Sequence, residues 1–399
     1  MNAGLYVHIP FCEIKCGYCD FFVVGHKEPQ VQSYLHALKN EIVLQAQDPE
    51  IKALRFDTLY FGGGTPSLLS AFDLESLFEA ITSLFHFTSN LEVTLETNPG
   101  TVDHNKLREY REVGVNRLSL GAQSFQPDEL IFLDRTHSAE DIFASFEDAR
   151  KAHFDNIGLD LIFGLPGQSF EIWRKNVASA VSLAPEHIST YNLTYEPRTP
   201  LAQKLRSGKL DACDDDTQKE MFCHAMEFLH EKGYHQYEIS NYALDGRQSL
   251  HNKKYWNGES YLGLGVSAHS YVNKRRFWNV HSMKKYKTAL LDQNNLPVEK
   301  EERLTPAQAD LERMYLGLRQ TKGLDLKQFH TATGSSFLVR HSATLSSLFD
   351  DDFKDKELVS GLTSGERNLQ SRFLKIEDGF LKLTREGILV SDDIFTLLT

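Results

Sequence analysis

Short apolar runs alternate with amphipathic helical segments over the first 240 residues of the chain. The runs are rich in β-branched and aromatic residues, which predicts strands, and the segments between them repeat apolar positions at helical spacing. We expect strands at 5–9, 58–61, 91–97, 117–121, 156–163 and 187–193, and helices at 31–46, 72–85, 103–113, 139–152, 170–183 and 215–231. This alternation predicts an α/β domain built around a parallel sheet.

Polar and glycine-rich residues follow the carboxyl ends of the expected strands. They include Gly62-Gly63-Gly64-Thr65-Pro66, Glu96-Thr97-Asn98-Pro99, Gly121-Ala122-Gln123-Ser124, Gly164-Leu165-Pro166-Gly167 and Tyr191-Asn192-Leu193-Thr194-Tyr195. In a barrel of parallel strands these ends share one rim, where active sites are built. Core strands alone do not require such residues, so the pattern favours a barrel over a doubly wound sheet.

The pattern changes after residue 240. Residues 241–298 hold a dense run of histidine and aromatic residues, among them His251, Trp256, His269 and Trp278. Neither a strand nor a helix period is clear in this stretch, so we assign it to a connecting region.

The last hundred residues predict a second, smaller domain. Residues 299–303 are charged and typical of a linker, and a helix is expected at 307–319. Glu377-Asp378-Gly379 lies between two apolar runs and predicts a hairpin. The predicted division is therefore a barrel at 1–240, the connecting region at 241–298 and a small α+β, winged-helix-like domain at 299–399.

Composition and charge exclude several classes of function. The chain has 399 residues and a formal net charge of -12, which argues against bulk binding of nucleic acid. No run of 18 apolar residues occurs, so we expect no membrane span. The first residues lack a basic segment followed by a long apolar one, so we expect no secretory signal and a cytoplasmic location.

Three of the five cysteines, Cys12, Cys16 and Cys19, lie within eight residues. In a reducing compartment such a group indicates a metal site rather than disulfides. Three thiolates on one loop can hold three irons of a [4Fe–4S] cluster and leave the fourth iron open to a small chelating molecule. A zinc site with His8 as the fourth ligand, or three unrelated buried cysteines, remains as an alternative.

The cysteine spacing, the aromatic Tyr18 before the last cysteine, the glycine strip and Glu96 together resemble the radical S-adenosylmethionine (SAM) superfamily. The resemblance implies a partial (β/α)6 TIM-like barrel, with SAM chelating the open iron through its amino and carboxylate groups. It implies SAM contacts from Tyr6, Tyr18, Gly63, Gly64, Thr65, Glu96, Gln123, Arg135, Asp160 and Thr194.

Each of these roles has a physical reason. Carboxylates such as Glu96 and Asp160 accept from an ammonium group or from ribose hydroxyls, and Arg135 holds a carboxylate. Tyr18 packs on the adenine ring, and glycines let the backbone approach the ligand. The alternative for the two acidic residues is that they are solvated carboxylates at strand ends.

Further motifs resemble the branch of coproporphyrinogen dehydrogenases and HemW-type haem chaperones. They are Tyr6-Val7-His8-Ile9-Pro10-Phe11-Cys12, Gly121-Ala122-Gln123-Ser124-Phe125, Arg135-Thr136-His137, Asp160-Leu161-Ile162-Phe163-Gly164-Leu165-Pro166 and Tyr191-Asn192-Leu193. The dehydrogenases carry a fourth cysteine where this chain has Phe21, and a longer arm before the cluster. Both departures favour the chaperone side.

The stretch His251-Asn252-Lys253-Lys254-Tyr255-Trp256 matches the H-N-x-x-Y-W motif of the HemW-like proteins. The resemblance implies that an exposed imidazole of His251 is an axial haem ligand beside an aromatic wall. A loop histidine next to a core tryptophan is the structural alternative.

Taken with the motifs, the resemblance implies a haem chaperone that binds haem, a [4Fe–4S] cluster and SAM and delivers haem to haem-dependent proteins. It implies no coproporphyrinogen III dehydrogenase activity and no catalytic residue. The alternative is that dehydrogenase, a radical SAM enzyme that oxidatively decarboxylates two propionates of coproporphyrinogen III. The residues do not identify the second haem ligand or the proteins that receive haem, which include membrane respiratory components as candidates. They also leave open whether the chain makes a peripheral contact with the membrane and whether it forms a homodimer.

Overall fold

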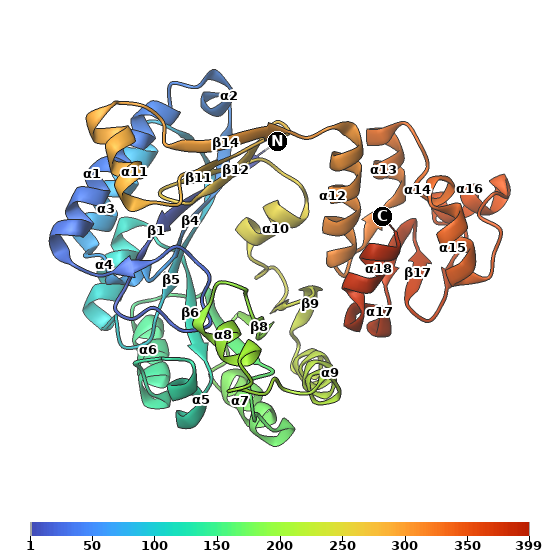
Figure 1. Cartoon of the computed structure of the whole chain (residues 1–399), viewed down its shortest axis with the longest axis horizontal. Helices are drawn as coiled ribbons and strands as arrows, with labels where there is room; N and C mark the ends of the chain where they lie inside the picture. Colours follow the sequence, from blue (N-terminus) through green and yellow to red (C-terminus); the bar gives the residue numbers. More distant parts are fainter. Residues whose placement is uncertain (1, 399) are drawn as a thin grey trace. The chain divides into compact units, whose positions relative to one another are not determined.

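The computed structural model describes residues 2–398, which form two compact units (Figure 1). The first unit comprises Met1–His235, Ser240–His251 and Glu259–Glu302, and the second comprises Gln236–Ile239, Asn252–Gly258 and Arg303–Thr399. The division differs from the expected one, because most of residues 241–298 lies in the first unit rather than in a separate connecting region.

The first unit is built on a single large sheet, in which β1 and β4 to β8 lie side by side and parallel. Its parallel strands are β1 (Asn2–Ile9), β4 (Arg55–Gly63), β5 (His86–Thr97), β6 (Arg117–Gln123), β7 (Ile157–Phe163), β8 (His187–Asn192) and β11 (Tyr261–Leu264), which pairs with β1. The main helices are α1 (Glu28–Gln45), α3 (Ala71–Thr82), α4 (His104–Val113), α6 (Ala139–Lys151), α7 (Phe170–Ser182) and α9 (Asp215–Glu231). The six expected strands and six expected helices of this region are confirmed, with ends shifted by a few residues.

Shorter elements complete the first unit. They are β2 (Phe11–Cys12), β3 (Val24–Gly25), α2 (Pro49–Lys52), η1 (Pro66–Leu68), α5 (Pro127–Phe132), α8 (Pro200–Arg206), β10 (Asn241–Ala243), β12 (His269–Val272), β13 (Arg275–Asn279), α11 (Met283–Lys287), η2 (Thr288–Asp292) and β14 (Val298–Arg303). The strand order from β14 to β10 is β14-β13-β12-β11-β1-β4-β5-β6-β7-β8-β10. This arrangement confirms the partial barrel.

The two faces of the sheet differ sharply in polarity. Side chains that point to the helices are apolar and fully buried, as with Leu5, Val7 and Ile9 of β1. The alternate residues point to the inner face, and strand pairing sets Tyr6 beside Tyr60 in one row. Because side chains alternate along a strand, polar motif residues within the strands, such as Glu96 and Asp160, lie on this inner face.

The helices begin where the sequence provides a capping side chain. Ser138 accepts from the backbone N–H of Asp141, whose side chain accepts from Ser138 in return, at the start of α6. Ser70 caps α3 and Asp103 caps α4 through the third residue of each helix. Such caps satisfy N–H groups that have no partner inside the helix, and they fix where each βα loop ends.

The predicted linker at 299–303 is wrong, because these residues form most of the strand β14. All of its charged residues are exposed. Charged side chains are typical of an edge strand, where they discourage pairing with another chain. The charged segment that was expected to be a linker therefore forms an edge strand of the sheet.

The second unit is α+β, as predicted. Its strands and helices are β9 (His235–Glu238), α10 (Leu250–Trp256), α12 (Pro306–Arg319), β15 (Leu324–Asp325), α13 (Leu326–Thr333), α14 (Phe337–Arg340), α15 (Ser342–Phe349), α16 (Lys356–Ser364), β16 (Leu369–Gln370), β17 (Leu374–Glu377), β18 (Phe380–Leu383), α17 (Arg385–Leu389) and α18 (Ser391–Leu397); β9 and α10 each begin in the first unit. The hairpin of β17 and β18 turns at Asp378 and Gly379, both with positive φ. This is the two-residue turn that the sequence predicted.

Candidate functional site

The three clustered cysteines lie on one loop between β2 and β3. These two short strands pair through Phe11 and Val24 and close the loop at its base. Cys12, Cys16 and Cys19 are all free thiols and half-buried. The loop is also fixed from across the rim, because the N–H of Gly17 donates to Oδ2 of Asp134 at 2.8 Å.

Burial raises the pKa of the Cys12 and Cys19 thiols, and their proximity to the other thiols of the loop raises it further. Protonated thiols lose their protons when they bind iron, so assembly of a cluster here releases protons. Among residues 2–398, no three histidine, cysteine or acidic side chains lie close enough to hold one metal ion. A [4Fe–4S] cube instead binds each thiolate through a different iron, and three thiols spread over one loop fit that demand.

His8, the residue considered as a fourth zinc ligand, is engaged elsewhere. Its Nδ1 lies 3.0 Å from the hydroxyl of Tyr6 and its Nε2 lies 2.9 Å from the carbonyl oxygen of Phe22. Burial lowers the pKa of His8 to about 4. Both ring nitrogens are therefore occupied, and the contact of Nε2 with Phe22 ties the cluster loop to β1.

The glycine strip is required by the packing of the chain itself. Gly63 has a φ of +112°, and a Cβ at this position would collide with the ring of His8. A Cβ at Gly64 would lie 2.6 Å from the carbonyl oxygen of Phe11 and 2.8 Å from that of Ile9. The strip therefore lacks side chains so that it can pack directly on β1 and on the base of the cluster loop.

Glu96 and Asp160 lie on the inner face, at neighbouring positions of the rim. Glu96 accepts from the N–H of Gly63 and from the hydroxyl of Tyr60, each at 2.9 Å, and burial raises its pKa to about 7. Asp160 accepts from the hydroxyl of Ser119 at 2.9 Å, and burial also raises its pKa. These are partly desolvated acceptors, not solvated carboxylates at the protein surface.

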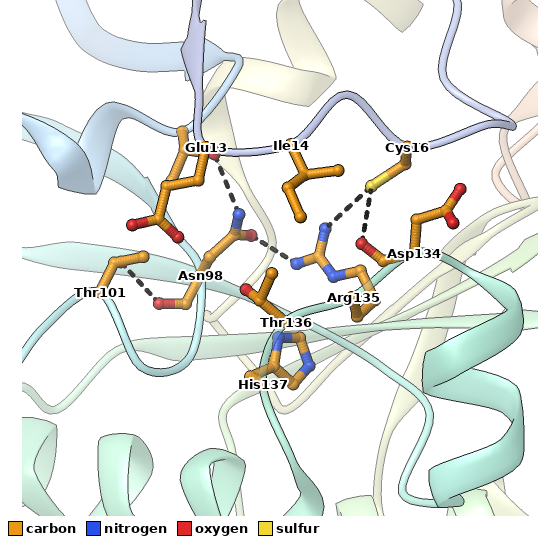
Figure 2. Close-up of a pocket in the computed structure, with 10 residues that line it drawn as sticks. Glu13, Ile14, Cys16, Asn98, Thr101, Asp134, Arg135, Thr136 and His137 are labelled. Atoms are coloured by element: carbon orange, nitrogen blue, oxygen red, sulfur yellow. Dashed lines mark hydrogen bonds between the residues drawn. The ribbon is translucent and has the colours of Figure 1, made fainter. Parts of the chain in front are cut away.

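Arg135 connects the cysteine loop to the strand ends (Figure 2). Its Nη2 donates to Oδ1 of Asn98 at 2.6 Å and to the carbonyl oxygen of Gly121 at 3.0 Å, and its Nη1 lies 4.0 Å from Sγ of Cys16. Gln123, with a φ of 65°, brings its side chain to within 3.0 Å of a Cβ built on Gly121. A guanidinium and two amides therefore meet beside the cysteines.

Three further residues predicted to contact SAM differ in how far they are buried. Tyr18 is half-buried, and burial together with its neighbours Cys16 and Cys19 raises its pKa although Arg135 opposes the shift. Thr65 is buried and its hydroxyl donates to Sγ of Cys12 at 3.5 Å. Thr194, by contrast, is exposed in the segment after β8.

His251 does not have the exposed imidazole that was expected, because only 1% of its surface is accessible. It lies in α10, with its ring stacked on Tyr60 at 4.9 Å between centroids. Its Nδ1 lies 2.8 Å from the hydroxyl of Thr58, and its backbone N–H donates to Glu92. His251 is thus packed inside the barrel, one side chain away from Glu96.

Comparison with known proteins finds a matching family model for each of the two parts of the chain. Residues 6–177 match the model of the radical SAM superfamily, and residues 304–390 match that of the HemN C-terminal domain. The heme chaperone HemW of Bacillus subtilis (strain 168) is 36% identical over 98% of this chain and 97% of its own length. That of Synechocystis is 33% identical over 100% of this chain and 96% of its own length.

This chain belongs to the HemW family. The match to the coproporphyrinogen III oxidase HemN of Escherichia coli has a TM-score of 0.81 over 100% of this chain and 90% of that chain, at 24% identity, and shows the shared fold. The family confirms the radical SAM barrel and implies a [4Fe–4S] cluster and SAM at the rim described above.

Some residues of the rim were not predicted from the sequence. Asn98 donates to Thr65 at 3.0 Å and accepts from Arg135, and Tyr60 joins Glu96 to His251. Asn98 directly follows the motif Glu96-Thr97, so its place at a strand end was a usable signal. Tyr60 lies inside an apolar run, where nothing in the sequence distinguishes an inward tyrosine from a core one.

Proposed function

We propose that this HemW-family chain is a haem chaperone, which binds haem, a [4Fe–4S] cluster and SAM and passes haem to haem-dependent proteins. The observation that carries the proposal is the likeness to the Bacillus subtilis heme chaperone HemW over nearly the whole of both chains. The geometry supports it, since the cluster cysteines and the polar rim residues come together on one face of the barrel.

The rim has the donors and acceptors that SAM requires. Glu96 faces the N–H of Gly63 at the end of β4, so it is placed to accept from the amino group of SAM. Arg135, beside Cys16, is placed to hold the carboxylate, and Asp160 to accept from ribose hydroxyls. When bound and reduced, the cluster supplies an electron to SAM. The other contacts in this proposal are those of Tyr6, Tyr18, Gly63, Gly64, Thr65, Gln123 and Thr194.

Phe21 separates this proposal from the dehydrogenase alternative. It stands where the dehydrogenases of this branch have a fourth cysteine, and its side chain is exposed beside the cluster loop, with 64% of its surface accessible. A phenyl group offers no donor to iron, so this loop supports no cluster chemistry that needs a fourth thiolate.

The recipients are proposed to be haem-dependent proteins, including respiratory components at the membrane. Residues 2–398 contain no helix that is long and apolar enough to cross a bilayer. We propose that any association with the membrane is peripheral. We also propose a cytoplasmic location, which the clustered cysteines support because a reducing compartment keeps such thiols free until they bind iron.

The proposal is tested by two parallel assays on the anaerobically reconstituted protein. A haem titration should saturate, and the haem-loaded protein should transfer haem to an apo-haem protein. With coproporphyrinogen III, SAM and a reductant, no protoporphyrinogen should form. Turnover of coproporphyrinogen III together with failure to retain haem would overturn the chaperone assignment and support the dehydrogenase.

A further inference from the structure

The inner face of the sheet continues past β1 into a ladder of aromatic and basic side chains, which we call the β11–β13 ladder. It consists of Tyr261, His269, Tyr271, Arg276 and Trp278. Strand pairing sets Tyr261 opposite Tyr271, Tyr271 opposite Arg276 and His269 opposite Trp278. Tyr261 pairs with Gly4 of β1, whose neighbour Leu5 points to the helices, so the ladder shares the inner face with Tyr6.

The opposite face of the same strands is covered. Ser270, Val272, Phe277 and Asn279, which alternate with the ladder residues, are all buried. His269 is exposed, and Tyr271, Arg276 and Trp278 are half-buried. The ladder is therefore an accessible aromatic surface on the first unit and not part of its core.

The ring of His269 is placed as a metal ligand. It stacks on Trp278 with centroids 5.6 Å apart and an angle of 17° between the planes. Stacking occupies the faces of the imidazole, whereas a metal binds in the ring plane, so the stacked ring keeps its lone pair available. Among residues 2–398, neither ring nitrogen of His269 has a hydrogen-bond partner.

His251, the histidine of the H-N-x-x-Y-W motif, differs in every one of these properties. It is 1% exposed, its Nδ1 lies 2.8 Å from the hydroxyl of Thr58, and its ring is stacked on Tyr60. Iron could reach the imidazole only if the ring left this packing. The ladder needs no such movement.

Arg276 adds the charge that an iron porphyrin requires. Its guanidinium lies over the ring of Tyr271, 5.7 Å from the centroid, two residues along the strand from Trp278. Two residues of a strand span about 7 Å, so Arg276 lies on the same strand face as the stacked pair of His269 and Trp278, one position of that face further along. The exposed contact of Arg276 with Glu302, at 3.5 Å, is weak.

We propose that His269 is an axial ligand of haem, with its ring oriented by stacking on Trp278 and with Arg276 pairing with a haem propionate. This inference rests on the proposed haem-chaperone function and names its binding site. Burial and the nearby Arg276 lower the pKa of His269, so the imidazole is neutral, as iron requires, at neutral pH.

The test is a titration of the reconstituted full chain with ferric haem, followed by its Soret and visible bands. We expect His269→Ala to shift the bands and to weaken haem binding by at least about tenfold. His36→Ala is the matched control, because His36 is an exposed imidazole on the outer helix α1; it should leave the spectrum and affinity unchanged. Trp278→Leu should weaken binding less, since the ligand itself remains.

Two outcomes would contradict the assignment while leaving the chaperone function in place. One is an unaltered spectrum for His269→Ala. The other is a spectrum that changes instead with His281→Ala, the next exposed imidazole of this unit, whose Nδ1 lies 2.9 Å from Ser267. If the unmodified chain fails to retain haem at all, the proposed function itself is wrong.

The role of Arg276 is tested separately with a chemically altered ligand. Arg276→Gln should weaken the binding of haem about fivefold and should have no effect on binding of the haem dimethyl ester, which lacks the propionate charges. Equal losses for both ligands would show that Arg276 acts through packing on Tyr271 and would remove it from the site.

Discussion

The rim of the parallel strands and the β11–β13 ladder share the inner face of one sheet, yet they differ in chemistry. The rim is lined by glycines, carboxylates and hydroxyls that follow parallel strands, where the βα loops converge. The ladder is formed by an antiparallel extension of the sheet that is covered on one face only, which leaves the other face open. A charged, polar ligand such as SAM fits the first region, and a flat ring with a metal and peripheral charges fits the second.

This difference indicates that the proposed SAM site and the proposed haem site are separate. No residue is common to the SAM set and to the ladder, and Tyr6 is the member of the SAM set that lies nearest to the ladder along the row of β1. Changes at the rim are therefore expected to spare the haem spectrum. Each prediction below tests that separation at a different point.

The largest effect is expected for the triple variant Cys12→Ser, Cys16→Ser, Cys19→Ser. With no thiolate on the loop, the cluster should be lost completely, while the Soret band of haem bound to the ladder should not change. Iron and acid-labile sulfide after anaerobic reconstitution measure the first effect, and a haem titration measures the second.

The matched control is Cys213→Ser with Cys223→Ser, because these two thiols lie outside the loop. It should retain full iron content. Retention of cluster absorbance by the triple variant would disprove the loop assignment, and loss of haem binding with the cluster would disprove the separation of the two sites.

A smaller effect is expected for Glu96→Gln, which removes a charge at the rim. Charge-assisted hydrogen bonds contribute about 1.5–3 kcal/mol, so SAM affinity should fall roughly 10- to 100-fold. Because burial raises the pKa of Glu96 to about 7, SAM affinity of the unmodified protein should increase as the pH rises from 6 to 8. Calorimetry across this range should show the dependence flattened in the variant.

Glu92→Gln is the control for this prediction. Glu92 lies on the same strand and is also buried, but it accepts from the N–H groups of Leu250 and His251 rather than from the rim. It should leave SAM affinity and its pH dependence nearly unchanged. An equal loss in both variants would mean that general charge inside the barrel, and not Glu96, governs SAM binding. Asp160→Asn then tests the other carboxylate whose pKa is raised.

The sequence was sufficient for the parallel strands because each is an apolar run followed by an amphipathic helical segment. The strands within residues 241–298 could not be predicted in the same way. In β12 and β13 buried positions alternate with more exposed ones, and His269, Tyr271 and Trp278 lie at the more exposed positions. An aromatic residue there looks like core, whichever way it points. The strand β14 was not predicted because its residues are charged. A run of charged residues indicates that a segment is exposed but does not indicate its backbone conformation.

The site shows a similar division. Glu96 could be placed at the rim from the sequence because it lies at the end of a strand, whereas Arg135 follows α5 and its role came from the family resemblance. The contact of Tyr60 with Glu96, and the collision that keeps Gly63 a glycine, depend on side chains from different strands. Burial of His251 could not be predicted either, since it depends on the packing of its ring on Tyr60 and Thr58.

The smallest effect on ligand binding is expected for His251→Ala. This variant nevertheless tests most directly whether haem binds at the β11–β13 ladder and not at His251. The sequence motif predicts altered haem bands and unchanged SAM affinity for this variant. The structure predicts the reverse, because the His251 ring supports Tyr60, whose hydroxyl donates to Glu96 at 2.9 Å. We expect a loss of roughly 2–5 kcal/mol in the free energy of unfolding, as for other large side chains removed from a core.

SAM affinity of His251→Ala should fall about two- to fivefold through Tyr60, and the haem bands should stay where they are. His251→Phe separates packing from ligation, since a phenyl ring can stack on Tyr60 but cannot bind iron. If packing is the role of His251, the Phe variant should recover most of the stability and the SAM affinity, with an unaltered Soret band. A Soret band displaced in both variants while His269→Ala has no effect would place the haem iron on His251, and the His251 ring would then have to leave its packing on Tyr60 when haem binds.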